Sequence, residues 1–270
     1  MRRLFLALLL ANGTAAIAGF PVTEQRTCPI GGERFSYTTT ASYSTWGARP
    51  DGKPFGSWEF PLALPECPGN GLVVYGEFSE ADLARLEPLI AQDDYRALRR
   101  RGDTSYYRAY WLMRRLDAPA PDALWMLVQA SWQAGDASPL RRRYLEELVE
   151  AAPLLGRPTD VTNLAVRARV INALRELGRF EEATAMIEAT PVDEIAPDSA
   201  TVRSTSDWRG HYRQLARLIA RRDSSTEPID MIPWRVGRER CEGEGAAALD
   251  AGQRAICAEV AARMAAPGRD

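Results

Sequence analysis

The pattern of hydrophobic and polar positions changes near residue 79 of this 270-residue chain. Beyond that point apolar side chains return every three or four positions, which is the spacing of amphipathic helices. Gly, Pro or Asp interrupts the pattern at intervals, and Ser79 begins an N-cap signature for the first helix. Pro88 is expected to interrupt this helix or to start the next one. The later segments predicted to be helical are 104–116, 121–134, 139–152, 161–177, 181–189, 206–222 and 251–265.

Residues 19–76 carry few helical signals and are rich in Thr, Ser, Tyr, Gly and Pro. Aromatic and β-branched residues predict strands at 35–40 and 71–75, and the Gly- and Pro-containing stretch 47–54 reads as a loop. The predicted fold class is therefore mainly α. A small β-containing module (19–76) precedes a helical domain (77–225) and a C-terminal helical segment (226–270).

The first 18 residues have the three regions of a secretory signal peptide. Two arginines precede an apolar run from Leu4 to Ala11, which is too short to span a bilayer. The A-x-A site Ala16-Ile17-Ala18 predicts cleavage before Gly19, with an uncleaved anchor or a buried N-terminal helix as the alternatives. We therefore expect a periplasmic or secreted protein with no membrane span after cleavage.

Charge and cysteine content narrow the classes of partner. The formal net charge is −2, so nothing favours binding to nucleic acid or to an anionic membrane. Four cysteines (Cys28, Cys67, Cys241 and Cys257) follow the predicted signal peptide. An even number of cysteines in an oxidising compartment favours disulfides, and four allow three pairings.

One helical segment resembles the turn of a tetratricopeptide repeat. In that family a glycine ends the first helix, an aromatic residue packs in the turn, and a small residue lets the second helix approach closely. Gly178, Phe180 and Ala183 match these positions, and Gly135 marks a weaker upstream copy. The resemblance implies stacked helical hairpins with a concave binding surface, and ordinary helical hairpins are the alternative.

The whole chain resembles an uncharacterised bacterial family in which a zinc ribbon of the CPxCG type precedes tetratricopeptide-like helices. The residues that carry this resemblance are Cys28-Pro29, Gly32, Phe35, Cys67-Pro68 and Gly71. Gly31 and Asn70 stand where the ribbon has its second cysteines, so we expect no zinc or other cofactor. If the two knuckles face each other as in a ribbon, Cys28 and Cys67 form a disulfide in place of the metal. Cys241 then pairs with Cys257, whose spacing suits a bridge between a helix and the preceding loop.

No motif for catalysis accompanies these features, and we assign no catalytic or metal-binding residue. There is no CxxC pair for redox chemistry, and the single histidine, His211, belongs to a helical segment without a nucleophile motif. We therefore expect a non-enzymatic, exported interaction or scaffold protein that binds an unknown protein or peptide. Arginine runs at 99–101 and 141–143 would form a basic strip if neighbouring hairpins stack; the alternative is that they are solvated helix ends. Candidate binding residues on the second run are Arg141, Arg142 and Arg143.

A second class of function depends on aromatic residues in the front loops. Tyr43, Trp46, Phe55 and Trp58 would serve as stacking surfaces for sugar rings. The alternative hypothesis is therefore a module that binds glycans of the cell envelope.

Overall fold

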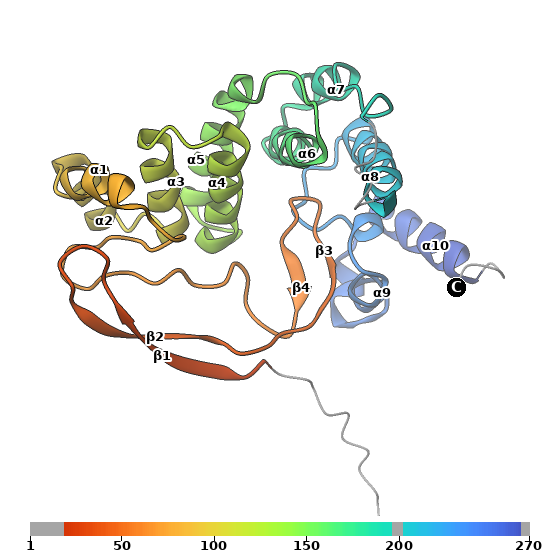
Figure 1. Ribbon diagram of the computed structural model, residues 1–270. Coiled ribbons are helices and arrows are strands. Elements are labelled where there is room, and N and C mark those ends of the chain that lie inside the picture. The colour runs from red at the N-terminus through yellow and green to blue at the C-terminus, as the bar shows by residue number, and fades with distance from the viewer. Residues whose placement is uncertain (1–18, 196–201, 266–270) are drawn as a thin grey trace, which may run out of the picture.

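The computed structural model describes residues 19–195 and 202–265, so the predicted signal peptide lies outside the described residues. Two β-hairpins lie along one side of a row of helices, and the chain ends in a helical pair at the far end of that row (Figure 1). The helices are α1 (Glu80–Ile90), α2 (Asp93–Arg100), α3 (Ser105–Arg115), α4 (Ala120–Ala134), α5 (Pro139–Glu150), α6 (Val161–Glu176), α7 (Phe180–Glu188), α8 (Val202–Ala220), α9 (Trp234–Glu242) and α10 (Ala251–Ala265).

Helix boundaries follow the capping residues and breaks seen in the sequence, within a few residues. At the start of α1 the Ser79 hydroxyl accepts from the Asp82 amide at 3.1 Å, and the Asp82 carboxylate accepts from the Ser79 amide at 3.2 Å. The expected break at Pro88 is wrong, because this residue lies inside the last turn of α1. So close to the C-terminal end of a helix, proline removes one backbone hydrogen bond without separating two helices.

The β-structure consists of two antiparallel hairpins. Strands β1 (Pro21–Thr27) and β2 (Arg34–Thr40) form the first hairpin, which confirms the strand predicted at 35–40. Strands β3 (Thr45–Ala48) and β4 (Pro54–Gly56) form the second, so part of the loop predicted at 47–54 is in fact paired. The strand predicted at 71–75 is wrong, since only an isolated bridge between Glu66 and Val73 is present.

Two loops, which we call the knuckle loops, share one backbone pattern. In residues 28–33 the Cys28 amide donates to the Glu33 carbonyl, and the Gly32 amide donates to the Cys28 carbonyl. In residues 67–72 the Cys67 amide donates to the Leu72 carbonyl, and the Gly71 amide donates to the Cys67 carbonyl. The disulfide Cys28–Cys67 joins the two loops, with the Cα atoms 5.6 Å apart.

The N-terminal part of the chain shares its core with the helices. Cys28, Cys67 and Leu72 are buried in one hydrophobic cluster with residues of α1 to α6. A second cluster lies between α6, α7 and α8. The predicted pairing of Cys241 with Cys257 is also present and ties α9 to α10, with a Cα separation of 5.7 Å.

Helices α4, α6 and α8 pack side by side, and α5 and α7 follow α4 and α6 as the second members of two helical hairpins. Gly178 ends α6 with a φ of +77°, while Phe180 and Ala183 are buried in the second cluster. These contacts match the local geometry expected from the sequence. Whether the hairpins are repeats of the tetratricopeptide type stays a prediction.

Candidate functional site

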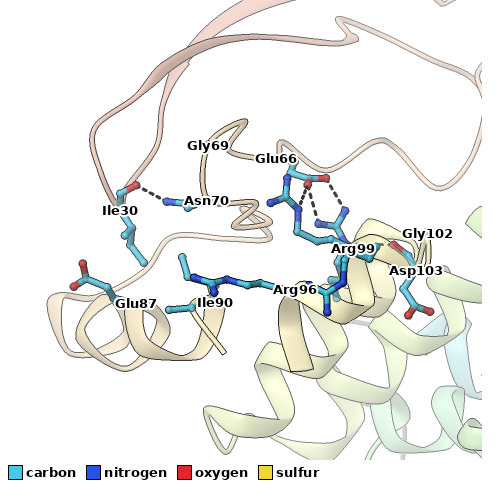
Figure 2. Close-up of a pocket in the computed structure, with 13 residues that line it drawn as sticks. Ile30, Glu66, Gly69, Asn70, Glu87, Ile90, Arg96, Arg99, Gly102 and Asp103 are labelled. Atoms are coloured by element: carbon cyan, nitrogen blue, oxygen red, sulfur yellow. Dashed lines mark hydrogen bonds and ion pairs between the residues drawn. The ribbon is translucent and has the colours of Figure 1, made fainter. Parts of the chain in front are cut away.

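A pocket of about 970 Å³ lies between the knuckle loops and the first three helices. Figure 2 shows its two sides: Ile30, Gly69 and Asn70 come from the knuckle loops, while the facing wall comes from α1, α2 and the turn before α3. Its size is within the range of sites that hold a small molecule or a short peptide segment. Four arginines line it, namely Arg96, Arg99, Arg100 and Arg108.

Two of these arginines are held by one carboxylate. Arg108 donates from both terminal nitrogens to Glu66 at 2.8 and 2.6 Å, and the Arg99 Nε lies 3.3 Å from the same carboxylate. The Arg99 guanidinium also lies directly on Gly71, where a Cβ atom would be 2.3 Å from its Cζ. Gly71, with a φ of +73°, is therefore needed both for its turn and for this close approach. Arg108, Arg99 and Glu66 thus form a fixed wall of the pocket.

The other two arginines are free to bind an anion. The Arg96 side chain is 56% exposed, and its one ion pair, with Asp93, is long at 3.9 Å. Arg100 is exposed and makes no ion pair within the described part of the chain. Asp103 also lines the pocket, but its carboxylate does not neutralise these two arginines. It accepts a hydrogen bond from Tyr144 and pairs with Arg101 and Arg143, and these three residues do not line the pocket.

The pocket is therefore cationic on one side and apolar on the other. Arg96 and Arg100 come from the face of α2, and Ile30 with Ile90 supplies the apolar contribution. The Glu87 carboxylate points away from the arginines, at the opposite end (Figure 2). An arginine guanidinium binds carboxylate and phosphate groups well because its planar array of donors matches their oxygens. The arrangement suits an anionic ligand that also carries an aliphatic part.

The second arginine run has three different environments. Arg141 is buried and donates to the Ser131 carbonyl, to Asp51 at 3.2 Å and to Glu176 at 2.6 Å. Arg142 is exposed and pairs only with Glu146, one helical turn away. Arg143 pairs with Asp103 and lies over the rings of Tyr107 and Tyr144. The structure therefore does not bring the three together as one binding strip.

Arg141 belongs to a buried ionic network that fixes the tip of the β3–β4 hairpin. Asp51 accepts from Arg49 at 3.2 and 2.5 Å, and Arg49 also donates to Asp136 at 3.0 Å. The Asp51 carboxyl is buried, which raises its pKa, but the hydrogen bonds and charges of Arg49 and Arg141 outweigh burial and lower it. Asp51 is therefore ionised and paired with two arginines, and these ion pairs hold the hairpin tip on the helices.

Further along the same face, α6 and α8 hold the hairpin through Arg169. Its Nη1 donates to the Pro50 carbonyl at 2.7 Å and lies 3.0 Å from the Nε2 of His211. Gly52, with a φ of +91°, lies so close that a Cβ atom would be 2.8 Å from the Arg169 Nε. The hairpin thus covers part of α6.

The aromatic residues proposed for sugar binding fall into two groups. Tyr43 and Trp46 are exposed, with 48% and 52% of their surface accessible. Phe55 and Trp58 are partly buried, and Trp58 packs against the backbone of Gly19. Only the first pair offers ring faces to a ligand.

The sequence analysis did not predict this pocket as a site, although the arginine run at 99–101 contributes Arg99 and Arg100 to its lining. The two disulfides indicate an oxidising compartment. Across residues 19–195 and 202–265, no helix is both long and apolar enough to cross a membrane. Within the same ranges, no group of three or more His, Cys, Asp or Glu residues is placed to hold a metal ion.

Comparisons with models of known families, with curated proteins and with solved structures found no match.

Proposed function

We propose that this is an exported interaction protein that binds an acidic segment of a partner protein or peptide in the arginine-lined pocket. The observation that carries the proposal is the pair Arg96 and Arg100, two exposed guanidiniums in one pocket without a close carboxylate partner. Arg99 and Arg108 add positive charge behind them, only partly offset by Glu66.

A peptide fits this pocket better than a bare anion. The volume of about 970 Å³ greatly exceeds that of a phosphate ion, and the lining includes Ile30 and Ile90 as well as arginines. An aspartate or glutamate next to an aliphatic residue would satisfy both sides. The net charge of −2 for the chain gives no general attraction to nucleic acid. The disulfides and the signal-like N-terminus support the periplasm as the place where this binding occurs.

The test is a fluorescence anisotropy titration of the full chain with labelled peptides. One peptide alternates Glu and Leu, and its matched control carries Gln in place of Glu. We expect the Glu peptide to bind at least tenfold more tightly, because a charge-assisted hydrogen bond contributes about 1.5–3 kcal/mol and 1.4 kcal/mol is a factor of ten. The double variant Arg96→Gln/Arg100→Gln should lose this preference.

The matched control is Arg142→Gln, which removes an exposed arginine on α5 away from the pocket. It should bind both peptides as the unmodified protein does. The proposal fails if the Glu and Gln peptides bind equally, or if the double variant keeps the preference while remaining folded by circular dichroism.

A further inference from the structure

Two large aromatic side chains three positions apart, Tyr43 and Trp46, lie exposed near the open end of the β3–β4 hairpin. Tyr43 and Trp46 have about half of their surface accessible, whereas most aromatic residues of the described chain are buried or partly buried. Tyr and Trp are enriched at interfaces, where one part of the side chain is apolar and its polar end reaches water.

The local structure fixes Trp46 in this position. Thr45 pairs with Gly56 and Gly47 pairs with Phe55, so Trp46 is the extra residue of a β-bulge. Bulges redirect a side chain relative to the regular strand. Gly47, directly after it, has a φ of +144° and lies so close to Pro233 that a Cβ atom would be 2.5 Å from the proline ring. The backbone beside Trp46 is therefore held against the C-terminal segment.

The ring of Tyr43 packs against a second aromatic ring. It meets the buried Phe60 edge to face, with the centroids 5.1 Å apart and the planes at 82°. Such a pair contributes about 0.5–1.5 kcal/mol beyond the area that it buries. Tyr43 is thus held against the core while half of its surface stays accessible.

Residues that carry hydroxyl groups lie beside these two aromatic residues in the sequence. The side-chain hydroxyls of Ser42, Ser44 and Thr45 make no hydrogen bond within the described residues, and residues 41–48 contain neither lysine nor arginine. Sugar rings stack their C–H faces on aromatic rings and present hydroxyls at the rim, which unpaired serines and threonines can bind.

We propose that Tyr43, Trp46 and the hydroxyls around them form a binding surface for a neutral polysaccharide chain. This surface is independent of the arginine-lined pocket and takes a different class of ligand. An exported protein with both sites would bind envelope glycan through the hairpins and an acidic partner through the pocket.

The test is co-sedimentation of the full chain with three insoluble polysaccharides: chitin, cellulose and purified peptidoglycan sacculi. We expect retention on at least one of them. Trp46→Leu keeps an apolar side chain but removes the flat ring, so it should weaken retention at least tenfold. Trp46→Phe keeps a ring and should stay within about threefold of the unmodified protein. Leu154→Ala, which alters an exposed apolar residue far along the chain, should have no effect.

Three results would overturn the proposal. The first is the absence of retention on all three polysaccharides. The second is equal retention of Trp46→Leu and the unmodified protein, which would mean that ring stacking plays no part. The third is binding to phosphatidylcholine vesicles that Trp46→Leu preserves, which would identify a general apolar contact. The pocket variant Arg96→Gln/Arg100→Gln should sediment normally, so failure of the peptide-binding proposal can be told apart from failure of this one.

Discussion

Replacing His211 with Gln removes the only histidine of the chain and gives a sharp test of the contact between α6 and α8. The His211 Nε2 lies 3.0 Å from the Nη1 of Arg169 and must be unprotonated to accept a hydrogen bond from it. Burial, together with the positive charge of Arg169, lowers the pKa of His211 to about 3. The Trp208 ring packs against the imidazole edge to face.

The sign of the pH dependence follows from this lowered pKa. In the unfolded chain a histidine has a pKa of about 6.5. Between pH 6.5 and the pKa in the folded protein, the unfolded chain binds a proton that the folded protein does not, so stability falls as pH falls. The contribution is complete above pH 6.5 and decreases by about 1.4 kcal/mol per pH unit below it. Between pH 8 and pH 5 the loss should be about 2 kcal/mol.

The assay is urea unfolding of the unmodified protein and of His211→Gln at pH 8, 6.5 and 5. Gln keeps an acceptor for Arg169 but does not titrate. Burial raises the pKa of Glu176, which acts in the opposite direction, and comparing the two proteins cancels this effect. The free-energy difference between them should shrink or reverse by about 2 kcal/mol as the pH falls. A constant difference, or a single imidazole NMR resonance that titrates near pH 6.5, would refute the reasoning.

Two further predictions concern packing and the hairpin tip. Asp51→Asn removes the charge that the buried Arg49 and Arg141 share, so it should lower the free energy of unfolding by about 3 kcal/mol in urea titrations, whereas Arg142→Gln should change it by less than about 1 kcal/mol. If the two variants lower the free energy of unfolding equally, the buried network stabilises the fold no more than an exposed ion pair does. Ala183→Leu should destabilise by about 1–3 kcal/mol, because Ala183 is fully buried between helices and an added side chain has no room; an unchanged melting temperature would contradict this packing.

The helical part of the fold could be predicted because its signals are local. Ser79 and Asp82 cap α1 through neighbouring backbone atoms, and Asp250 and Gln253 make the same reciprocal contacts before α10. Glycine and proline mark most of the remaining boundaries. Each of these interactions joins residues a few positions apart, so the sequence alone shows both partners.

The hairpin network could not be predicted, because its partners are far apart along the chain. Asp51 pairs with Arg141 across 90 positions, and Arg49 pairs with Asp136 across 87. A stretch rich in Gly and Pro reads as a loop whether it is solvated or inserted among helices. The strand expected at 71–75 failed for a related reason: Leu72 and Val73 are apolar because the knuckle loop is buried, and not because they lie in a sheet.

The two arginine runs show why composition did not locate the pocket. Both runs lie near helix ends, and from the sequence they look alike. Arg141 starts a helix that meets the hairpin tip, so it is buried and paired. Arg100 ends a helix that faces the knuckle loops across an open space, so it stays exposed. The difference lies in what faces each run, which only the three-dimensional arrangement determines.

The knuckle loops contain one cysteine each, and the disulfide between Cys28 and Cys67 joins them. Each loop closes a tight turn with the same two backbone hydrogen bonds. Three positions after Cys67, Asn70 donates to the Ile30 carbonyl at 2.8 Å and accepts from the Leu72 amide at 2.9 Å. One amide side chain therefore joins one loop to the other and closes its own turn. The Gly69 amide also donates to the Glu33 carboxylate at 2.8 Å, so two hydrogen bonds join the loops beside the disulfide. Of these three links, only the disulfide depends on an oxidising compartment. Asn70 also lines the arginine-lined pocket, so the side chain that joins the two loops shapes the candidate binding site as well.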